Sequence, residues 1–187
     1  MTNRHVRLAS PNDVPRLAKL IDISVRALSD GYYSPAQVEG ALRHVFGVDT
    51  QLIDDGTYYV VDEASELIAA GGWSRRRTLF GGDQMKAPHD PMLDPAAEPA
   101  RIRAFYVHPA HARRGLGRLL FETCARAARQ AGFRELTLVA TKPGEPLYVA
   151  LGFRVVERLV VDVPGGIALP CARMTRALGD DDARAQG

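Results

Sequence analysis

Hydrophobic positions follow two different periods along the chain, and their order predicts an α/β protein. Residues 5–9 alternate between apolar and polar side chains, which is typical of a short strand. Apolar residues then recur at helical spacing to about Leu28, after a Ser-Pro capping pattern that begins at Ser10. A second such pattern at Ser34 predicts another helix, which ends near Gly47.

The rest of the chain continues this alternation of strands and helices. Two strand-like runs joined by a polar turn, residues 57–62 and 66–74, predict a β-hairpin. Further on, the pattern predicts helices at 115–130 and 145–151 and strands at 101–109, 133–141 and 153–163. Residues 165–178 are expected to form a turn and a final strand. We therefore expect one domain over residues 1–178, a mixed sheet flanked by about four helices, and a frayed tail at 179–187.

Between the predicted hairpin and the strand at 101–109, residues 75–100 show neither the strand period nor the helix period of apolar residues. The segment contains the glycines and prolines at positions 81, 82, 88, 91, 95 and 99. A loop of this length without regular structure is uncommon inside a domain and is usually functional or disordered. We expect it to act as a lid or to cover a contact between subunits.

Composition excludes several classes of protein. The 187 residues are 46% hydrophobic and 25% charged, with a formal net charge of +2. There is no concentrated basic stripe, so we expect no nucleic-acid partner. No apolar run approaches the length of a signal peptide or a membrane span, which predicts a cytoplasmic protein without membrane contact. The two cysteines, Cys124 and Cys171, match no metal-ligand spacing, so no metal is expected.

A glycine turn at residues 112–118 precedes the helix predicted from residue 115. The first amides of a helix have no partner within it, and they lie at the positive end of its dipole. Gly115 and Gly117 would let a phosphate approach that backbone, and Arg113, Arg114 and Arg118 could add charged contacts. The same residues also fit a plain helix start with solvated arginines, and the turn alone does not separate the two. It matches neither a Walker loop nor a dinucleotide fingerprint.

A second candidate is the short helix at 145–151, which carries Tyr148 and stops at Gly152 before a strand. One interpretation makes Tyr148 a core aromatic with its hydroxyl at the edge. The other makes it a proton donor, because a phenol with a pKa of about 10 can protonate a leaving thiolate.

Together these two motifs resemble the GNAT superfamily of acyl-CoA-dependent N-acyltransferases. The sequence RRGLG at 113–117, after the strand FYV, matches the family's pyrophosphate motif. The sequence LYVALGF at 147–153 matches the family's Phe-Tyr-x-x-x-Gly-Phe motif. The order of elements also agrees from residue 4 to about residue 178. The resemblance implies a mostly antiparallel sheet whose central strand pair is splayed.

The resemblance also implies the roles of particular residues. Acetyl-CoA would be the co-substrate, with its pantetheine arm hydrogen-bonded to the backbone of Phe105 and Val107. Its pyrophosphate would be held by amides of the turn, comprising Ala112, Arg113, Arg114, Gly115, Leu116, Gly117 and Arg118. A primary amine would attack the thioester directly, and Tyr148 would act as general acid. Many members pair as homodimers through their C-terminal strands, so a homodimer is one expectation, and the sequence leaves the oligomeric state open.

Three positions depart from the family pattern. At the position where members carry Gln or Arg, this sequence has Ala112, so only backbone amides would contact the pyrophosphate there. Thr141 or Lys142 replaces the usual Asn after the fifth strand. The strand RIRAFYV has no carboxylate to serve as general base, and either Glu98 before it or His108 after it could take that role.

The acceptor is a small-molecule or protein amine whose identity the sequence does not fix. Tyr32, Tyr33 and Trp73 could line its site, although the two tyrosines fit equally well as packing between helices. Two other functions stay open. One is a non-catalytic acyl-CoA sensor of the same fold, and the other is a nucleotide-binding protein unrelated to acyl transfer.

Overall fold

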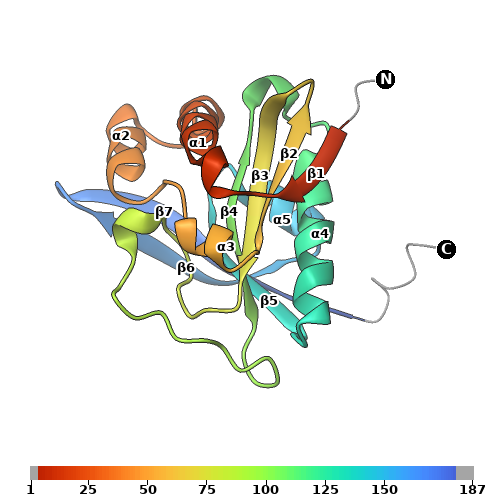
Figure 1. The fold of residues 1–187 in the computed structure, drawn as a ribbon. Helices are drawn as coiled ribbons and strands as arrows, with labels where there is room; N and C mark the ends of the chain where they lie inside the picture. Colours follow the sequence, from red (N-terminus) through yellow and green to blue (C-terminus); the bar gives the residue numbers. More distant parts are fainter. Residues whose placement is uncertain (1–3, 180–187) are drawn as a thin grey trace.

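Seven strands form one mixed sheet in the computed structural model, which describes residues 4–179 (Figure 1). The sheet order is β1-β2-β3-β4-β5-β7-β6, and the pair β4–β5 is parallel while the other neighbours are antiparallel. The strands are β1 (Arg4–Leu8), β2 (Tyr58–Glu63), β3 (Glu66–Ser74), β4 (Ala100–Val107), β5 (Glu135–Thr141), β6 (Arg154–Val163) and β7 (Ile167–Ala177). The predicted mixed, mostly antiparallel sheet is therefore confirmed, and most of the predicted tail lies outside the described residues.

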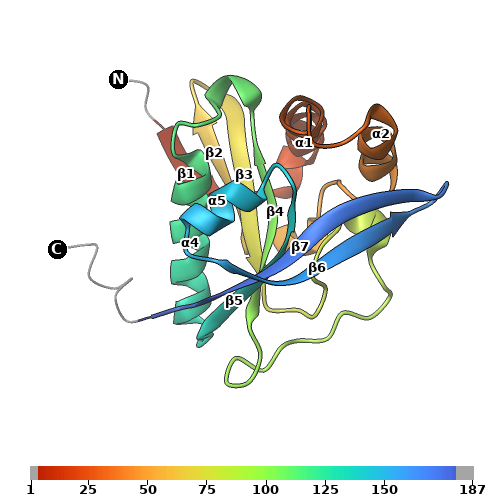
Figure 2. The same cartoon turned by 180° about the vertical axis from the view of Figure 1, so that it is seen from behind.

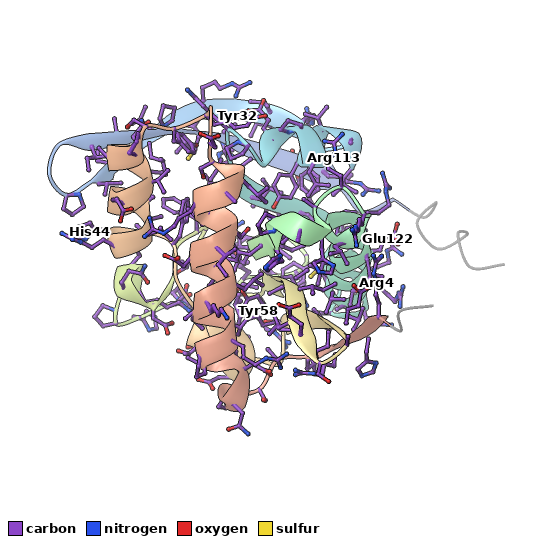
Figure 3. The ribbon with its side chains drawn as sticks, turned by 90° about the horizontal axis from the view of Figure 1, so that it is seen from above. Arg4, Tyr32, His44, Tyr58, Arg113 and Glu122 are labelled. Carbon is purple, nitrogen blue, oxygen red and sulfur yellow. The ribbon has the colours of Figure 1, made fainter. Side chains whose placement is uncertain are left out.

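Helices cover both faces of this sheet (Figure 2). Those of the described chain are α1 (Val14–Leu28), α2 (Pro35–His44), α3 (Thr50–Asp54), α4 (Leu116–Gln130) and α5 (Glu145–Ala150). Seen from above, α1 and α2 lie on one side of the sheet, and α4 and α5 lie on the other (Figure 3). Each face has an apolar core: Leu17 of α1 and Val60 of β2 belong to one, and Phe121 of α4 and Leu136 of β5 belong to the other.

The two capping patterns of the sequence are formed in the structure. At the start of α2, the Gln37 amide donates to Ser34 Oγ at 3.2 Å, and the Ser34 amide donates to Gln37 Oε1 at 2.8 Å. At Ser10, the chain first makes a 3₁₀ turn (Pro11–Asp13), and the Ser10 amide donates to Asp13 Oδ2 at 2.8 Å. These contacts satisfy N–H groups that a helix start leaves unpaired, which is why both helices begin where the pattern indicated.

Helix α2 ends earlier than predicted, and the sequence pattern missed α3. Five residues make little more than one turn, too short to show a helical period. The segment 75–99 has little regular structure, as expected, but hydrogen bonds anchor it. It contains a 3₁₀ turn at Asp83–Met85 and a bridge between Arg76 and Met92, and the Thr78 amide donates to Asp90 Oδ1 at 2.9 Å.

Strands β4 and β5 diverge soon after they meet. Their pairing comprises Ala100 with Leu136 and Arg101 with Thr137. Beyond these pairs β5 continues beside β7 to Thr141, while β4 continues beside β3 to Val107. The central pair is therefore splayed, as the resemblance implied, and the divergence opens the sheet where the candidate site lies.

Candidate active site

A cavity of about 240 Å³ fills the gap between the splayed strands. On the face covered by α4 and α5, its lining includes Phe105, Gly117, Leu147 and Tyr148. On the opposite face lies what we call the acceptor side, lined by Ser24, Val25, Leu28, Ser29, Phe46, Gly47, Leu79, Phe80 and Gly81. The cavity therefore passes through the sheet, and it can bring together two ligands that enter from opposite faces.

A β-bulge in β4 shapes the cavity. The β3–β4 register shifts between Ala70 and Gly72, and Ala104 has a left-handed φ of 55°. Its carbonyl accepts a hydrogen bond of 3.2 Å from the Tyr58 hydroxyl. The bulge places the Phe105 ring over Gly71, where an added Cβ would lie 2.6 Å from the ring. Gly71 is thus required by the close approach of this aromatic ring.

Tyr148 lies on α5 with its ring in the cavity wall. It is buried, and its ring centroid is 6.3 Å from that of Phe105 and 5.7 Å from that of Phe153. No described residue makes a hydrogen bond with its hydroxyl. Burial raises the pKa of this hydroxyl well above its ordinary value, so it stays protonated at neutral pH and can act as a donor.

The predicted glycine turn lies beside this cavity and leads into α4. Gly115 is the N-cap residue with a φ of 80°, and Arg113 has a φ of 63°. The Ala112 amide donates to the Pro109 carbonyl at 3.2 Å, so the free amides begin at Arg113. At Gly117 an added Cβ would lie 2.7 Å from Leu147, so this glycine lets α4 approach α5.

A family model described as the acetyltransferase (GNAT) family matches residues 22–153. The chain belongs to this family. The match covers the turn before α4 and the Tyr148 motif, so the recognition made from these two motifs is confirmed. Comparison with curated proteins gave no match.

Solved structures share the GNAT fold along nearly the whole chain. A GCN5-related N-acetyltransferase from Rhodopseudomonas palustris is 19% identical, with a TM-score of 0.67 over 95% of this chain and 97% of that one. PaiA N-acetyltransferase from Thermoplasma acidophilum, in complex with coenzyme A, is 16% identical, with a TM-score of 0.63 over 94% and 99%. The yncA protein from Salmonella typhimurium, with acetyl-CoA, is 20% identical, with a TM-score of 0.61 over 96% of both chains.

Within this GNAT fold, the predicted backbone contacts for the acyl donor lie on β4. Phe105 lines the cavity beside the bulge, and so does Val107. The Val107 amide donates to Ser24 Oγ at 3.2 Å, so in this structure it already has a partner from α1. Sequence reasoning missed Ser24, although a serine among the apolar residues of a helix face is a detectable signal.

Sequence reasoning also missed a buried ion cluster behind the acceptor side. Arg103 on β4 donates to Asp49 Oδ2 at 2.7 Å and to the carbonyls of Thr78 at 3.0 Å and Gly81 at 2.7 Å. Lys86 pairs with the other oxygen of Asp49. The residues of this cluster lie far apart in the sequence, and no local pattern links them. The cluster fixes segment 78–86 against the sheet.

A second contact network supports the turn before α4. Buried Glu63 on β2 accepts a hydrogen bond from Arg4 Nε at 3.0 Å, and its other oxygen lies 3.2 Å from His111 Nδ1. Arg4 Nη1 also donates to the Arg114 carbonyl at 3.3 Å. Glu63 and Arg4 together thus contact both ends of the segment 111–114. Figure 3 shows Arg4 and Arg113 on the side of the molecule where Glu122 of α4 lies.

The structure places both candidate bases away from the described cavity lining. Glu98 Oε2 accepts from the Asp94 amide at 2.9 Å, and this carboxylate pairs with Arg77. His108 Nδ1 accepts from the Ala110 amide at 3.2 Å. Of the two residues that could replace the family's Asn, Thr141 lines the cavity. The described lining holds no carboxylate.

The three residues predicted to bind the acceptor also lie outside this lining. Tyr33 is buried, and its hydroxyl donates to the Pro170 carbonyl at 2.7 Å and accepts from the Lys142 amide at 2.9 Å. Trp73 is buried beneath α4, with its ring centroid 6.0 Å from that of Phe133. Tyr32 is exposed at the end of α1 (Figure 3). Packing accounts for the first two, and the role of Tyr32 stays a prediction.

Residues 4–179 contain no group of three or more His, Cys, Asp or Glu side chains placed to hold a metal ion. The same residues form no helix with the length and apolar character that crossing a membrane requires.

Proposed function

We propose that this protein transfers an acetyl group from acetyl-CoA to a primary amine by direct attack, with Tyr148 as general acid. The observation that carries this proposal is the position of Tyr148 in a cavity that connects both faces of the sheet. Two similar structures hold CoA or acetyl-CoA, which supports the choice of donor.

The donor would bind mainly through backbone groups. β4 lacks a neighbouring strand along residues 102–107 on the side of β5, so an extended pantetheine arm could lie along this edge at Phe105 and Val107. An amide carbonyl of the pantetheine arm would then replace the Ser24 hydroxyl as acceptor of the Val107 N–H. The pyrophosphate would lie at the free amides of Arg113 to Arg118, where the helix dipole favours negative charge.

The chemistry then needs a neutral amine. Its nitrogen attacks the thioester carbonyl carbon, the carbon–sulfur bond breaks, and the sulfur takes a proton from the Tyr148 hydroxyl. The nitrogen loses one proton, which restores the tyrosine, so no net proton is released. Removing an ammonium group from water favours its neutral form, so an acceptor in this largely apolar cavity loses its proton more readily. This effect explains how the amine can lose its proton in a site whose described lining has no carboxylate base.

Release of free thiol in the presence of acetyl-CoA and amines tests this function. We expect release well above the hydrolysis background with at least one primary amine. The lack of a described base favours a second function, a non-catalytic acyl-CoA sensor. Acetyl-CoA would stabilise such a sensor against heat, and no thiol would be released. A nucleotide-binding protein would be stabilised by ATP or NAD and not by CoA.

A further inference from the structure

The charges around the acceptor side limit which amines the cavity can bind. Five of its side chains are apolar, namely Val25, Leu28, Phe46, Leu79 and Phe80. Among all the described lining residues, Arg103, Tyr106 and Tyr148 carry ionisable side chains. Whether a charged acceptor could bind therefore depends on whether these three groups are free to pair with it.

The Arg103 guanidinium already takes part in a buried cluster. Its two terminal nitrogens donate to Asp49 and to the carbonyls of Thr78 and Gly81, and its side chain is 2% exposed. A carboxylate on the acceptor would have to break this buried cluster to reach Arg103. Since removing one partner of a buried pair is strongly unfavourable, Arg103 does not provide an anion site.

The two tyrosines do not provide a charge either. Burial raises the pKa of Tyr106 and Tyr148 well above the ordinary value, so both hydroxyls are neutral at neutral pH. The Ser24 hydroxyl, which accepts from the Val107 amide until the donor replaces it, is also neutral. A cationic acceptor therefore finds hydroxyl and carbonyl groups in the described lining, but no carboxylate.

Charged groups near the cavity are paired elsewhere or lie at its rim. Asp49, behind Arg103, is shared between Arg103 and Lys86. Glu145, at the start of α5, is held by Arg158 at 2.6 Å. The Lys142 ammonium lies 6.0 Å from the Tyr33 ring centroid on an exposed side chain. The rim of the cavity therefore carries charges of both signs, whereas the acceptor side has no charged group that is free to pair with an acceptor.

Resting on the proposed function, we infer that the acceptor is a compact primary monoamine whose remaining part is uncharged and apolar, such as an arylalkylamine or alkylamine. The apolar side chains would bury its body, and the open position beside Tyr148 would receive its nitrogen. A second charge would enter the cavity without a partner, which is costly in an apolar environment. Polyamines, aminoglycosides and free amino acids are therefore poor substrates.

Matched pairs of amines test this inference. Phenethylamine and phenylalanine differ by one carboxylate, and hexylamine and 1,6-diaminohexane differ by one ammonium. We expect kcat/KM from thiol release to be at least about 100-fold lower for the doubly charged member of each pair. Equal rates within the pairs, or turnover of a lysine peptide without turnover of the monoamines, would overturn the inference.

A charge introduced into the wall gives an independent readout. Leu28 lines the acceptor side at the end of α1 and is 37% exposed, so Leu28→Asp should fold. We expect it to raise the ratio of kcat/KM for diaminohexane over hexylamine by about tenfold. Leu8→Asp is the matched control, because Leu8 is 49% exposed on β1 and away from the described lining. An unchanged ratio in Leu28→Asp, with an unchanged melting temperature, contradicts the inference.

These outcomes separate this inference from the proposed function. If no amine raises thiol release, the proposed function fails. If charged amines and monoamines react equally well, acetyl transfer stands and the restriction to apolar monoamines fails.

Discussion

At the scale of the residue, the cavity combines a protonated phenol with glycines that make room for aromatic and aliphatic side chains. The Tyr148 hydroxyl lies in an apolar environment without a described partner, so it is free to donate a hydrogen bond to a ligand. Gly71 and Gly117 each remove a Cβ that would otherwise lie within 2.7 Å of a neighbouring side chain. Their contribution to the site is therefore steric.

Tyr148→Phe should lower kcat about 100-fold, because general acid catalysis by a positioned side chain contributes about 10²–10⁴. The Kd for acetyl-CoA should stay within a factor of about two, since the ring remains in place. Stopped-flow thiol release and calorimetric titration measure the two quantities. Tyr59→Phe, a tyrosine outside the described cavity lining, is the control. An unchanged kcat in Tyr148→Phe would remove this residue from the acid role.

Gly71→Ala should destabilise the protein by about 1–3 kcal/mol, because the new methyl group would overlap the Phe105 ring. Urea unfolding measures the loss. In the double variant Gly71→Ala, Phe105→Leu, the smaller side chain should recover part of it. If Gly71→Ala alone leaves the free energy of unfolding unchanged, the close approach of Phe105 does not constrain this position.

At the scale of the element, the turn before α4 depends on contacts from β1 and β2. Arg113 holds a left-handed conformation that is uncommon for a residue other than glycine. The contacts of Glu63 with Arg4 and His111 fix the chain on both sides of this residue. The turn is therefore held in shape before a ligand binds, and less conformational entropy should be lost on binding.

Glu63→Gln should weaken CoA binding about tenfold, because it removes a charged partner from both Arg4 and His111. Isothermal titration with CoA measures the change. Glu66→Gln is a close control, since Glu66 is the exposed register partner of Glu63 in the β2–β3 hairpin. Equal affinity in the wild type and Glu63→Gln would show that the turn keeps its conformation without this carboxylate.

Local signals explain which elements could be predicted from the sequence. The capping residues Ser34 and Gln37, and the glycine turn before α4, lie within a few residues of the structure that they determine. The cluster of Arg103, Asp49 and Lys86 depends on contacts over 37 residues or more, so no local pattern could show that the long loop is anchored. For the same reason the sequence left open whether Tyr33 lines an acceptor site or packs between helices, and it offered Trp73 only as a candidate for that site. Tertiary packing determines the positions of both residues.

At the scale of the whole molecule, an ion network links the N-terminal elements to the sheet. Arg7 on β1 contacts both Asp13 oxygens, at 2.7 and 2.8 Å, and contacts Asp62 on β2 at 2.8 Å. Arg16 on α1 also reaches Asp62 at 2.8 Å. The network joins β1, β2 and α1, so its charge state bears on the stability of this part of the fold.

The network predicts a loss of stability in acid. Arg7 holds the pKa of Asp13 well below its usual value of about 4, so the folded state binds a proton less readily than the unfolded state. The contribution is therefore complete above about pH 4 and decreases as the pH falls further. Asp13→Asn should lower the free energy of unfolding by about 2–3 kcal/mol at pH 6 and by less at pH 3. Urea unfolding at both pH values measures this difference.

Asp22→Asn is the control for this prediction. Asp22 forms an exposed pair with Arg26 at 2.9 Å, and exposed pairs contribute about 0–1 kcal/mol. An equal loss for the two variants, or a loss in Asp13→Asn that does not depend on pH, would contradict the assignment to the Arg7 contact.

The divergence of β4 and β5 gives the sheet two strand edges in its interior. An unpaired strand edge can add a strand from another chain, which is a common route to aggregation. Here Ser24 on α1 covers the Val107 amide, and α5 lies over the opposite face of the same gap. Helices α1 and α5, which line the proposed active site, therefore also keep the unpaired edge of β4 from pairing with a second copy of the protein.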